Sequence, residues 1–157
     1  MEEHQIQRGQ QWLEELLRLA QIPSVVTPNP TPECNWLTIE ESNLTPEQIE
    51  ILIGPDGTVI DAIQYLCNTI LHITDDHEEQ SAYTVELNGY RVRRLEELRS
   101  MAEDAAEQVR MTGEEYELTS LSSAERRQVH SILSECDDIE TYSRGQEPDR
   151  RLVVRLR

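Results

Sequence analysis

The pattern of hydrophobic and polar positions predicts two successive sets of helices and strands. Apolar side chains recur every three or four positions in some stretches and every second position in others. These are the periods of an amphipathic helix and of a half-buried strand. Helices are predicted over about 8–20, 46–53, 58–72, 92–111 and 123–136, strands over about 36–40, 81–87, 116–118, 139–142 and 150–156, and at most a short strand near 25–26 in a proline-rich stretch.

Proline, glycine and polar caps mark the ends of two of these helices. Pro46 suits a first helical turn, and Gly54 follows the last apolar residue of a short helix. Ser122, followed three residues later by Glu125, is a capping-box pattern. The fifth predicted helix therefore begins next to Ser122.

Arg126 and His130 lie four residues apart on that helix and therefore share a face beside its apolar stripe. A guanidinium donates two parallel hydrogen bonds, and an imidazole donates from either ring nitrogen, so the pair suits a phosphate group. An ordinary exposed Arg–His pair has the same spacing. The spacing alone therefore does not predict an anion site.

The surrounding residues form a longer motif. Glu-Arg-Arg-x-x-His at 125–130, followed by Thr-x-Ser-x-Gly-x-x-Pro-x-Arg-Arg-x-Val-Val at 141–154, resembles the R-three-H domain, a family that binds single-stranded nucleic acid. The resemblance implies that Arg126 and His130 are the signature pair. It also implies one nucleic-acid-binding surface formed by Arg126, Arg127, His130, Ser143, Arg144, Gly145, Arg150 and Arg151. Tyr142 is the nearby candidate for stacking on a base, and a core position suits it equally well.

The first set of elements resembles a KH domain, because Gly-x-x-Gly at 54–57 lies between two predicted helices. The words around it, and Tyr-Arg-x-Arg-Arg at 90–94, are similar to the Jag (SpoIIIJ-associated protein) family of bacteria, in which a KH domain precedes an R-three-H domain. The resemblance runs from about residue 8 to the end, without the separate N-terminal domain of many Jag proteins.

The Gly-x-x-Gly segment departs from the family where a KH domain clamps the nucleic-acid backbone. Family members commonly carry Lys or Arg between the glycines, whereas this chain has Pro55 and Asp56. Proline lacks a backbone donor, and aspartate repels phosphate. We therefore expect a degenerate loop, Gly54, Pro55, Asp56 and Gly57, that binds no RNA. The glycines are equally explained by a tight turn between two helices.

The charge is strongly acidic and uneven. The 157 residues have a net charge of −17, which disfavours a polyanion. Residues 1–89 hold two basic and 16 acidic side chains, a balance of −14, whereas residues 119–157 hold seven of each. All fixed cations are arginines, which suit phosphate contact, although a genomic preference would give the same composition. Arg91, Arg93 and Arg94 crowd one helix start, where phosphate contact and pairing with the acidic first half are equally good explanations.

Other functional classes have little support in the sequence. The acidic run 75–79 is interpreted as a solvated loop rather than a metal site, and no cofactor or metal is expected. Cys34, Cys67 and Cys136 lie far apart, the last two on predicted helix stripes, so free thiols in a reducing cytosol are expected. There is no catalytic motif, no signal peptide and no apolar run long enough to insert into a membrane.

The sequence thus predicts a cytoplasmic bacterial α+β protein with two small domains, each a small sheet with packed helices. Residues 1–88 are expected to be KH-like, and residues 89–157 to be the R-three-H domain. The expected function is regulatory binding of single-stranded RNA, possibly also single-stranded DNA, chiefly through the second domain. The alternative is a protein–protein adaptor linked to membrane-protein insertion or cell elongation. For either role, the resemblance implies a small KH-only protein as a possible partner.

Overall fold

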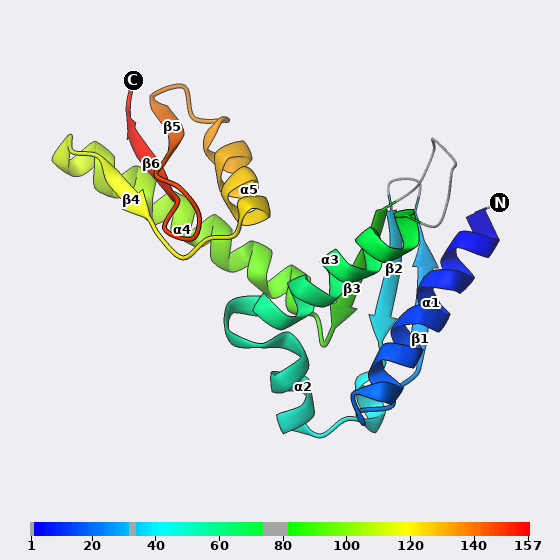
Figure 1. Ribbon diagram of the computed structural model, residues 1–157. Helices are drawn as coiled ribbons and strands as arrows, with labels where there is room; N and C mark the ends of the chain where they lie inside the picture. The colour runs from blue at the N-terminus through cyan, green and yellow to red at the C-terminus, as the bar shows by residue number, and fades with distance from the viewer. Residues whose placement is uncertain (1, 32–33, 74–81) are drawn as a thin grey trace. The chain divides into compact units, whose positions relative to one another are not determined.

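The computed structural model describes residues 2–31, 34–73 and 82–157. The chain divides into two compact units, Met1–Arg91 and Val92–Arg157, with the boundary inside the fourth helix. Each unit has one three-stranded sheet with helices packed against it (Figure 1). The predicted α+β class is confirmed. Strand residues 36–39 and 151–156 belong to different sheets, as expected.

The first unit follows the order helix, two strands, two helices, strand. Its strands are ordered β1-β2-β3, with β1 antiparallel and β3 parallel to β2. Short 3₁₀ turns at 41–43 and 55–57 precede and follow α2. The elements are α1 (Glu2–Leu19), β1 (Val26–Pro30), β2 (Cys34–Ile39), α2 (Pro46–Ile53), α3 (Thr58–Ile73) and β3 (Ala82–Leu87).

Strand β1 is longer than the sequence suggested. It runs through Pro28 and Pro30, which pair in register with Leu37 and Asn35 of β2. Proline cannot donate to a ladder, but β1 is an edge strand with a neighbour on one side only, and edge strands tolerate proline. The expectation of at most a short strand near 25–26 was therefore wrong about its length.

Helices α1 and α3 cover one face of the first sheet, as the alternating burial of its strands requires. In β2, Asn35, Leu37 and Ile39 are buried and their neighbours are partly exposed. The core consists of aliphatic side chains from the sheet and both helices: Leu13, Leu17, Leu37, Ile39, Ile60, Ile63, Cys67, Val85 and Leu87. Burial raises the pKa of the Cys67 thiol to about 12, so Cys67 is a buried thiol as predicted.

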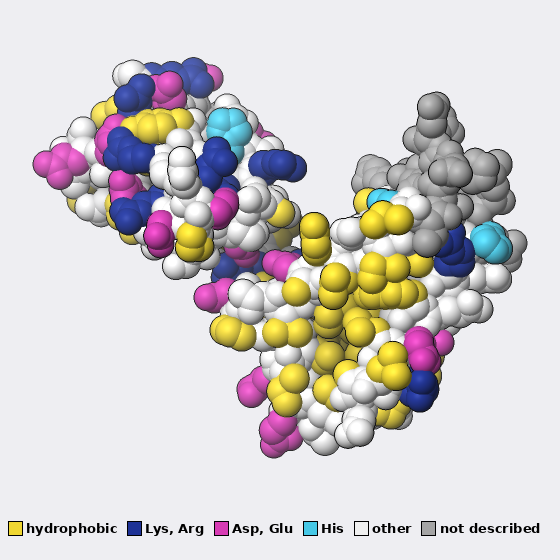
Figure 2. Space-filling model, viewed as in Figure 1, with side chains coloured by type: hydrophobic (Ala, Val, Ile, Leu, Met, Phe, Trp, Pro, Cys, Tyr) yellow, Lys and Arg dark blue, Asp and Glu magenta, His cyan; other side chains and the backbone are white. Residues whose placement is uncertain are grey.

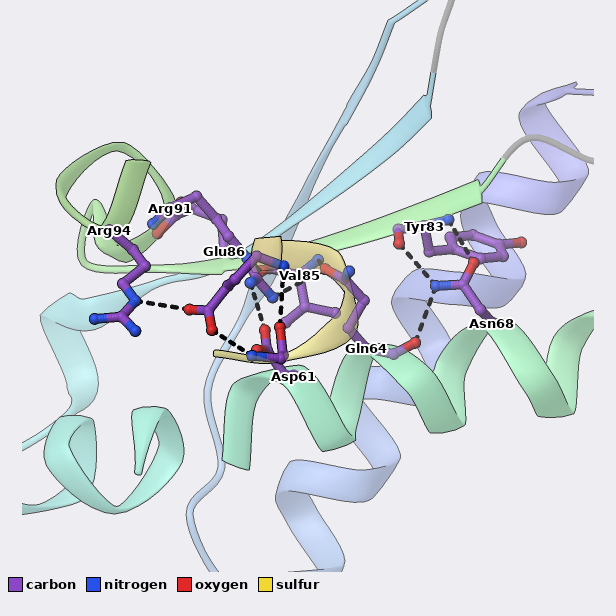
Figure 3. A network of polar contacts seen from close by, with 10 residues as sticks. Asp61, Gln64, Asn68, Tyr83, Val85, Glu86, Arg91 and Arg94 are labelled. Carbon is purple, nitrogen blue, oxygen red and sulfur yellow. Dashed lines mark hydrogen bonds and ion pairs between the residues drawn. The ribbon is translucent and has the colours of Figure 1, made fainter. Parts of the chain in front are cut away.

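The outer edge of β3 is satisfied by side chains of α3. Asn68 accepts from the Tyr83 N–H and donates to the Tyr83 carbonyl, both at 2.8 Å (Figure 3). Gln64 accepts from the Val85 N–H at 2.9 Å. An unpaired strand edge is a template for association, and these amides occupy it in place of a fourth strand.

Arg91 ties the start of the fourth helix to the first unit. Its guanidinium forms an ion pair with Asp61 and donates to Gln64 (3.0 Å) and to the carbonyl of Val85 (3.1 Å) (Figure 3). The Glu86 carboxylate accepts from the Arg91 backbone N–H at 3.0 Å. Of the two explanations for arginines at this helix start, pairing with the acidic first half therefore holds for Arg91.

The glycines at 54 and 57 are required by the local packing. Gly54 has φ +72° and Gly57 has φ +75°, the left-handed region in which side chains are strained. A Cβ on Gly57 would lie 1.8 Å from the Tyr90 hydroxyl, and one on Gly54 would lie 2.5 Å from Val59. The turn between α2 and α3 explains both glycines without any ligand.

The second unit has helices on one face of an antiparallel sheet ordered β4-β6-β5. The elements are α4 (Tyr90–Thr112), β4 (Tyr116–Leu118), α5 (Ser123–Leu133), β5 (Ile139–Arg144) and β6 (Arg151–Leu156). Small side chains on α4 pack beside aliphatic residues of α5 and the sheet. The core includes Leu98, Ala102, Ala105, Val109, Val129, Leu133, Ile139, Leu152 and Val154.

Helix α5 ends earlier than the apolar spacing indicated. The helix stops at Leu133, and Cys136 lies in the following turn, where its N–H donates to the Leu133 carbonyl at 3.0 Å. Arg110 of α4 donates two hydrogen bonds, at 2.6 and 2.8 Å, to Asp138 in the segment that enters β5. The expectation that Cys136 continues the helical stripe was wrong, although its thiol is free and half-buried.

Membrane and metal signals were also compared with the structure. None of the described helices is both long and apolar enough to cross a membrane. Within the same residues, no three His, Cys, Asp or Glu side chains are grouped to hold a metal ion. The acidic run 75–79 lies outside the described residues.

Replacing Gly57 by alanine is expected to destabilise the first unit by more than about 3 kcal/mol, because left-handed strain adds to a clash with Tyr90. Gly113→Ala is the matched control: it has a similar φ of +72° but no atom within 4 Å of the added Cβ. It should cost only the strain, about 1–2 kcal/mol. Urea unfolding followed by circular dichroism measures both, and equal losses would contradict the packing explanation.

Candidate nucleic-acid interface

Helix α5 begins with the predicted capping box. The Ser122 hydroxyl accepts from the Glu125 N–H at 3.2 Å, and the Glu125 carboxylate accepts from the Ser122 N–H at 2.8 Å. The other oxygen of Glu125 accepts from Arg94 of α4 at 2.7 Å. This buried carboxylate therefore fixes the first turn of α5 against α4.

An open hollow of about 370 Å³ lies between the outer side of α5 and strands β5 and β6. In the part of the chain that the structure describes, its lining contains cationic and hydroxyl side chains and no carboxylate. The lining residues are Ser123, Arg126, Arg127, His130, Thr141, Tyr142, Ser143, Arg150 and Leu152. In a chain with a net charge of −17, such a lining is the clearest local departure from the overall charge.

Arg126 is buried, whereas an arginine of the predicted nucleic-acid-binding surface would be exposed. Its side chain is 5% exposed. The guanidinium donates to the carbonyls of Leu121 (2.6 Å) and Arg150 (3.3 Å). It also donates to the Ser123 hydroxyl (2.9 Å) and to Glu147. Arg126 and His130 line the same hollow, but the guanidinium is already bonded to the protein, because a buried charge needs partners.

His130 and Thr141 are in contact across the hollow. The Nδ1 atom of His130 is hydrogen-bonded to the Thr141 hydroxyl of β5, and the imidazole is exposed. The contact orients the ring and leaves Nε2 as the atom directed away from Thr141. His130 is therefore placed to contact a ligand in the hollow.

Arg127 and Arg150 are the exposed cations of the hollow. Within the described part of the chain, neither side chain has a hydrogen-bond or ion-pair partner. Arg127 follows Arg126 on α5, and Arg150 comes from the loop that precedes β6. Two arginines from separate segments thus face one space with unused donors.

Arg144 and Arg151 lie on the opposite face of the sheet. They are cross-strand neighbours, one residue away from Ser143 and Leu152, which line the hollow. Because successive strand residues point to opposite faces, Arg144 and Arg151 point away from it. Gly145 starts the following loop with φ +88°, and does not line the hollow.

This outer face is a network of ion pairs around Tyr142. Arg144 pairs with Glu115 and Glu117, Arg151 with Glu117, and Arg155 with Glu140. Arg151 lowers the pKa of Glu117 mainly through its hydrogen bond, and Arg144 does the same for Glu115. The guanidiniums of Arg144 and Arg155 lie 5.4 and 5.2 Å from the Tyr142 ring centre. Tyr142 is thus held at a polar sheet face rather than in the core.

Figure 2 shows where charged and hydrophobic side chains lie on one face of each unit. Arginine side chains are interspersed with acidic ones over the second unit, whereas hydrophobic side chains predominate in the view of the first unit. The exposed apolar residues of the first unit include several on α3, namely Tyr65, Leu66, Ile70 and Ile73.

The loop between α2 and α3 offers few backbone donors. Gly57 donates its N–H to the Gly54 carbonyl at 3.2 Å, Gly54 donates to Glu50 at 2.8 Å, and Pro55 has no N–H. Pro55 and Asp56 are exposed, with Asp56 at φ +52°. The N–H groups of Gly54 and Gly57 are therefore engaged within the protein.

Several residues of the hollow were missed by the sequence reasoning. Ser123 and Leu152 line it, Thr141 orients His130, and Glu147 pairs with Arg126. Thr141 lay within the quoted motif, so its position was available. The ion pair between Arg126 and Glu147, 21 residues apart, had no signal in the spacing.

Residues 96–156 match the family model of the R-three-H domain. A domain of this class, named after the Arg-x-x-x-His signature, is therefore present in the second unit, and it includes α5 and every residue of the hollow.

The chain is also similar to bacterial proteins named "RNA-binding protein KhpB". It is 30% identical over 115 residues to that of Clostridium symbiosum, which covers 73% of this chain and 51% of the relative. It is 32% identical over 126 residues to that of Bacillus subtilis strain 168, covering 75% and 60%. For Streptococcus pneumoniae D39 the identity is 32% over 103 residues, covering 66% and 31%. The chain thus spans 31% to 60% of the length of these relatives.

Replacing Arg126 by alanine is expected to lower the free energy of unfolding of the second unit by about 2–4 kcal/mol, because buried acceptors lose their donors. Replacing the exposed Arg127 should change it by no more than about 0.5 kcal/mol. Thermal unfolding followed by circular dichroism gives both values. Equal small effects would show that the buried guanidinium is not needed for the fold.

Proposed function

We propose that this protein binds single-stranded nucleic acid, RNA above all and also DNA, through the hollow beside α5. The lining carries the proposal: within the described residues it has no carboxylate and holds two arginines without ion-pair partners, and phosphate contacts supply most of the affinity for nucleic acid. The match to the R-three-H domain and the printed name of the relatives support the same ligand.

Four side chains are proposed to contact the ligand directly. Arg127 and Arg150 donate to phosphate oxygens from two sides of the hollow, and His130 donates from the ring nitrogen that Thr141 leaves available. Ser143 adds a hydroxyl at the rim. A volume of about 370 Å³ is near the lower end of small-molecule sites, about 300–1,000 Å³, which suits one nucleotide of a single strand.

We propose that the first unit is a KH-like domain whose loop contributes little affinity. Its order of helix, two strands, two helices and strand, with Gly-x-x-Gly between α2 and α3, supports this assignment. The loop carries Asp56 in place of a cation, and its glycine N–H groups donate within the protein. Recognition is therefore assigned to the R-three-H domain, which we propose to run from residue 89 to residue 157.

A role as an adaptor is the second candidate. The exposed apolar side chains of α3 favour it, because adjoining apolar residues on a surface often mark a protein contact. The partner suggested by the sequence resemblance is a small KH-only protein. Both roles are compatible with a cytoplasmic bacterial protein, the location that the sequence predicts.

Arg127→Ala and Arg150→Ala are each expected to weaken binding of a short single-stranded RNA about tenfold, the effect of losing one charge-assisted phosphate contact. Each should also reduce the slope of log affinity against log salt by about one. Arg151→Ala is the matched control, since Arg151 is adjacent to Arg150 but pairs with Glu117 on the other face. Fluorescence anisotropy at several salt concentrations measures these effects. If all three variants bind like the wild type, the hollow is not the RNA site and the adaptor role is favoured.

The double variant Pro55→Lys, Asp56→Arg is expected to bind single-stranded RNA more tightly than the wild-type chain, with a steeper salt dependence, because two cations replace an anion at the loop. The control places the same two cations elsewhere on the first unit, at the exposed residues Glu41 and Ser42. The inert-loop proposal is wrong if Asp56→Ala alone weakens binding.

A further inference from the structure

We infer that Arg126 is a positioning residue, which holds the loop between β5 and β6 so that Arg150 faces the hollow, and does not itself contact the nucleic acid. The inference rests on the proposed function and assigns a different part to the first residue of the Arg-x-x-x-His signature. It is based on the burial of Arg126, on the direction of its donors and on the connections of the loop.

The donors of Arg126 are directed into the protein. Nη1 donates to the carbonyls of Leu121 and Arg150, and Nη2 donates to Ser123 and Glu147. These four contacts engage most of the five N–H groups of a guanidinium. With 5% of the side chain exposed, a phosphate in the hollow has little access to the remainder.

Most of the contacts that attach the loop to α5 come from Arg126, and Ser123 adds a hydrogen bond of 3.3 Å to Glu147. The β5–β6 ladder closes with Arg144 opposite Arg151, so residues 145–150 lie outside it. Within the loop, the Asp149 N–H donates to Gln146 at 2.9 Å, which forms a local turn but gives no anchor to the helix. Arg126 supplies that anchor at both ends, through Glu147 and through the carbonyl of Arg150.

The contacts of Arg126 also affect the position of Arg150, another residue of the hollow. The carbonyl that Arg126 holds belongs to Arg150, whose side chain lines the hollow. Releasing this backbone would let Arg150 move away from a bound phosphate. Arg127 is carried by α5 itself, so its position does not depend on the loop.

A competing explanation is that Glu147 covers Arg126 until a phosphate replaces it. The carboxylate is exposed and bound by Nη2 and Ser123, as a phosphate oxygen would be. The two carbonyl bonds of Nη1 disfavour this explanation, because they keep the guanidinium buried after Glu147 leaves. The two explanations predict opposite effects of removing Glu147.

The test is a pair of double-mutant cycles on the full chain, with binding of a short single-stranded RNA measured by fluorescence anisotropy. Arg126→Met keeps much of the side-chain length and removes the donors. It should weaken binding about tenfold, as Arg150→Ala does, and the double variant should be no more than about tenfold weaker, because both changes remove one contact. In the control cycle, Arg126→Met with Arg127→Ala should be additive, about 100-fold weaker.

A second pair of variants tests the loop without altering the buried arginine. Glu147→Ala and Asp149→Ala each remove one carboxylate from the same loop, so long-range charge changes equally. Of these two carboxylates, only Glu147 has a side-chain contact to α5 within the described residues. We expect Glu147→Ala to bind about threefold more weakly than Asp149→Ala, of the order of one partly exposed charge-assisted bond.

Three outcomes would overturn the inference. Additive losses for Arg126→Met with Arg150→Ala would show that Arg126 makes its own contact. Tighter binding by Glu147→Ala than by Asp149→Ala would show that Glu147 shields a ligand-binding arginine. If Arg127→Ala and Arg150→Ala both bind like the wild type, the proposed function is wrong, and so is this inference, which rests on it. The first two outcomes contradict the inference and leave the proposed function intact.

Discussion

The burial of one guanidinium determines the local structure of the second unit. A buried charge must be bonded to the protein, and Arg126 meets this requirement with acceptors from three segments: the turn before α5, the first turn of α5 and the loop before β6. The chain between β5 and β6 therefore has to return to the helix. That return brings Arg150 to the same hollow as Arg127 and His130. A residue expected at the binding surface is thus buried and bonded to the segments around the hollow.

Net charge is a poor guide to this molecule, because most acidic side chains near the arginines neutralise them individually. The pairs include Arg91 with Asp61, Arg94 with Glu125, Arg110 with Asp138, Arg144 with Glu115 and Arg151 with Glu117. What matters for a polyanion is the cations that remain without an ion-pair partner. In the part of the chain that the structure describes, Arg127 and Arg150 are two such cations lining one hollow. The potential at a site depends on this local arrangement rather than on the sum of charges.

Most helices and strands could be predicted from the sequence, because amphipathic periods reflect which face each element buries. The short helix at 46–53 and the strand at 116–118 agree with the prediction to the residue. The predicted element boundaries were wrong where contacts with the rest of the fold determine the local structure. The prolines of β1 are tolerated only because that strand lies at an edge, and the turn containing Cys136 ends a stripe that the spacing alone would continue.

For the site, the motif identified the correct segments of the chain. Strand alternation and ion pairs separated Arg144 and Arg151 from the hollow. The burial of Arg126 could not be read from its spacing to His130.

The glycine loop of the first unit shows how packing alone can require the residues of a motif. Gly57 is required because Tyr90 packs against its backbone, and Gly54 because Val59 does. Both requirements belong to the fold, so neither glycine depends on a bound phosphate. Pro55 and Asp56, by contrast, are exposed, and packing places little restriction on them. A loop of this kind can keep its shape while its charge changes from attractive to repulsive, and the same logic applies to Arg126, whose identity the buried hydrogen bonds require whether or not it touches RNA.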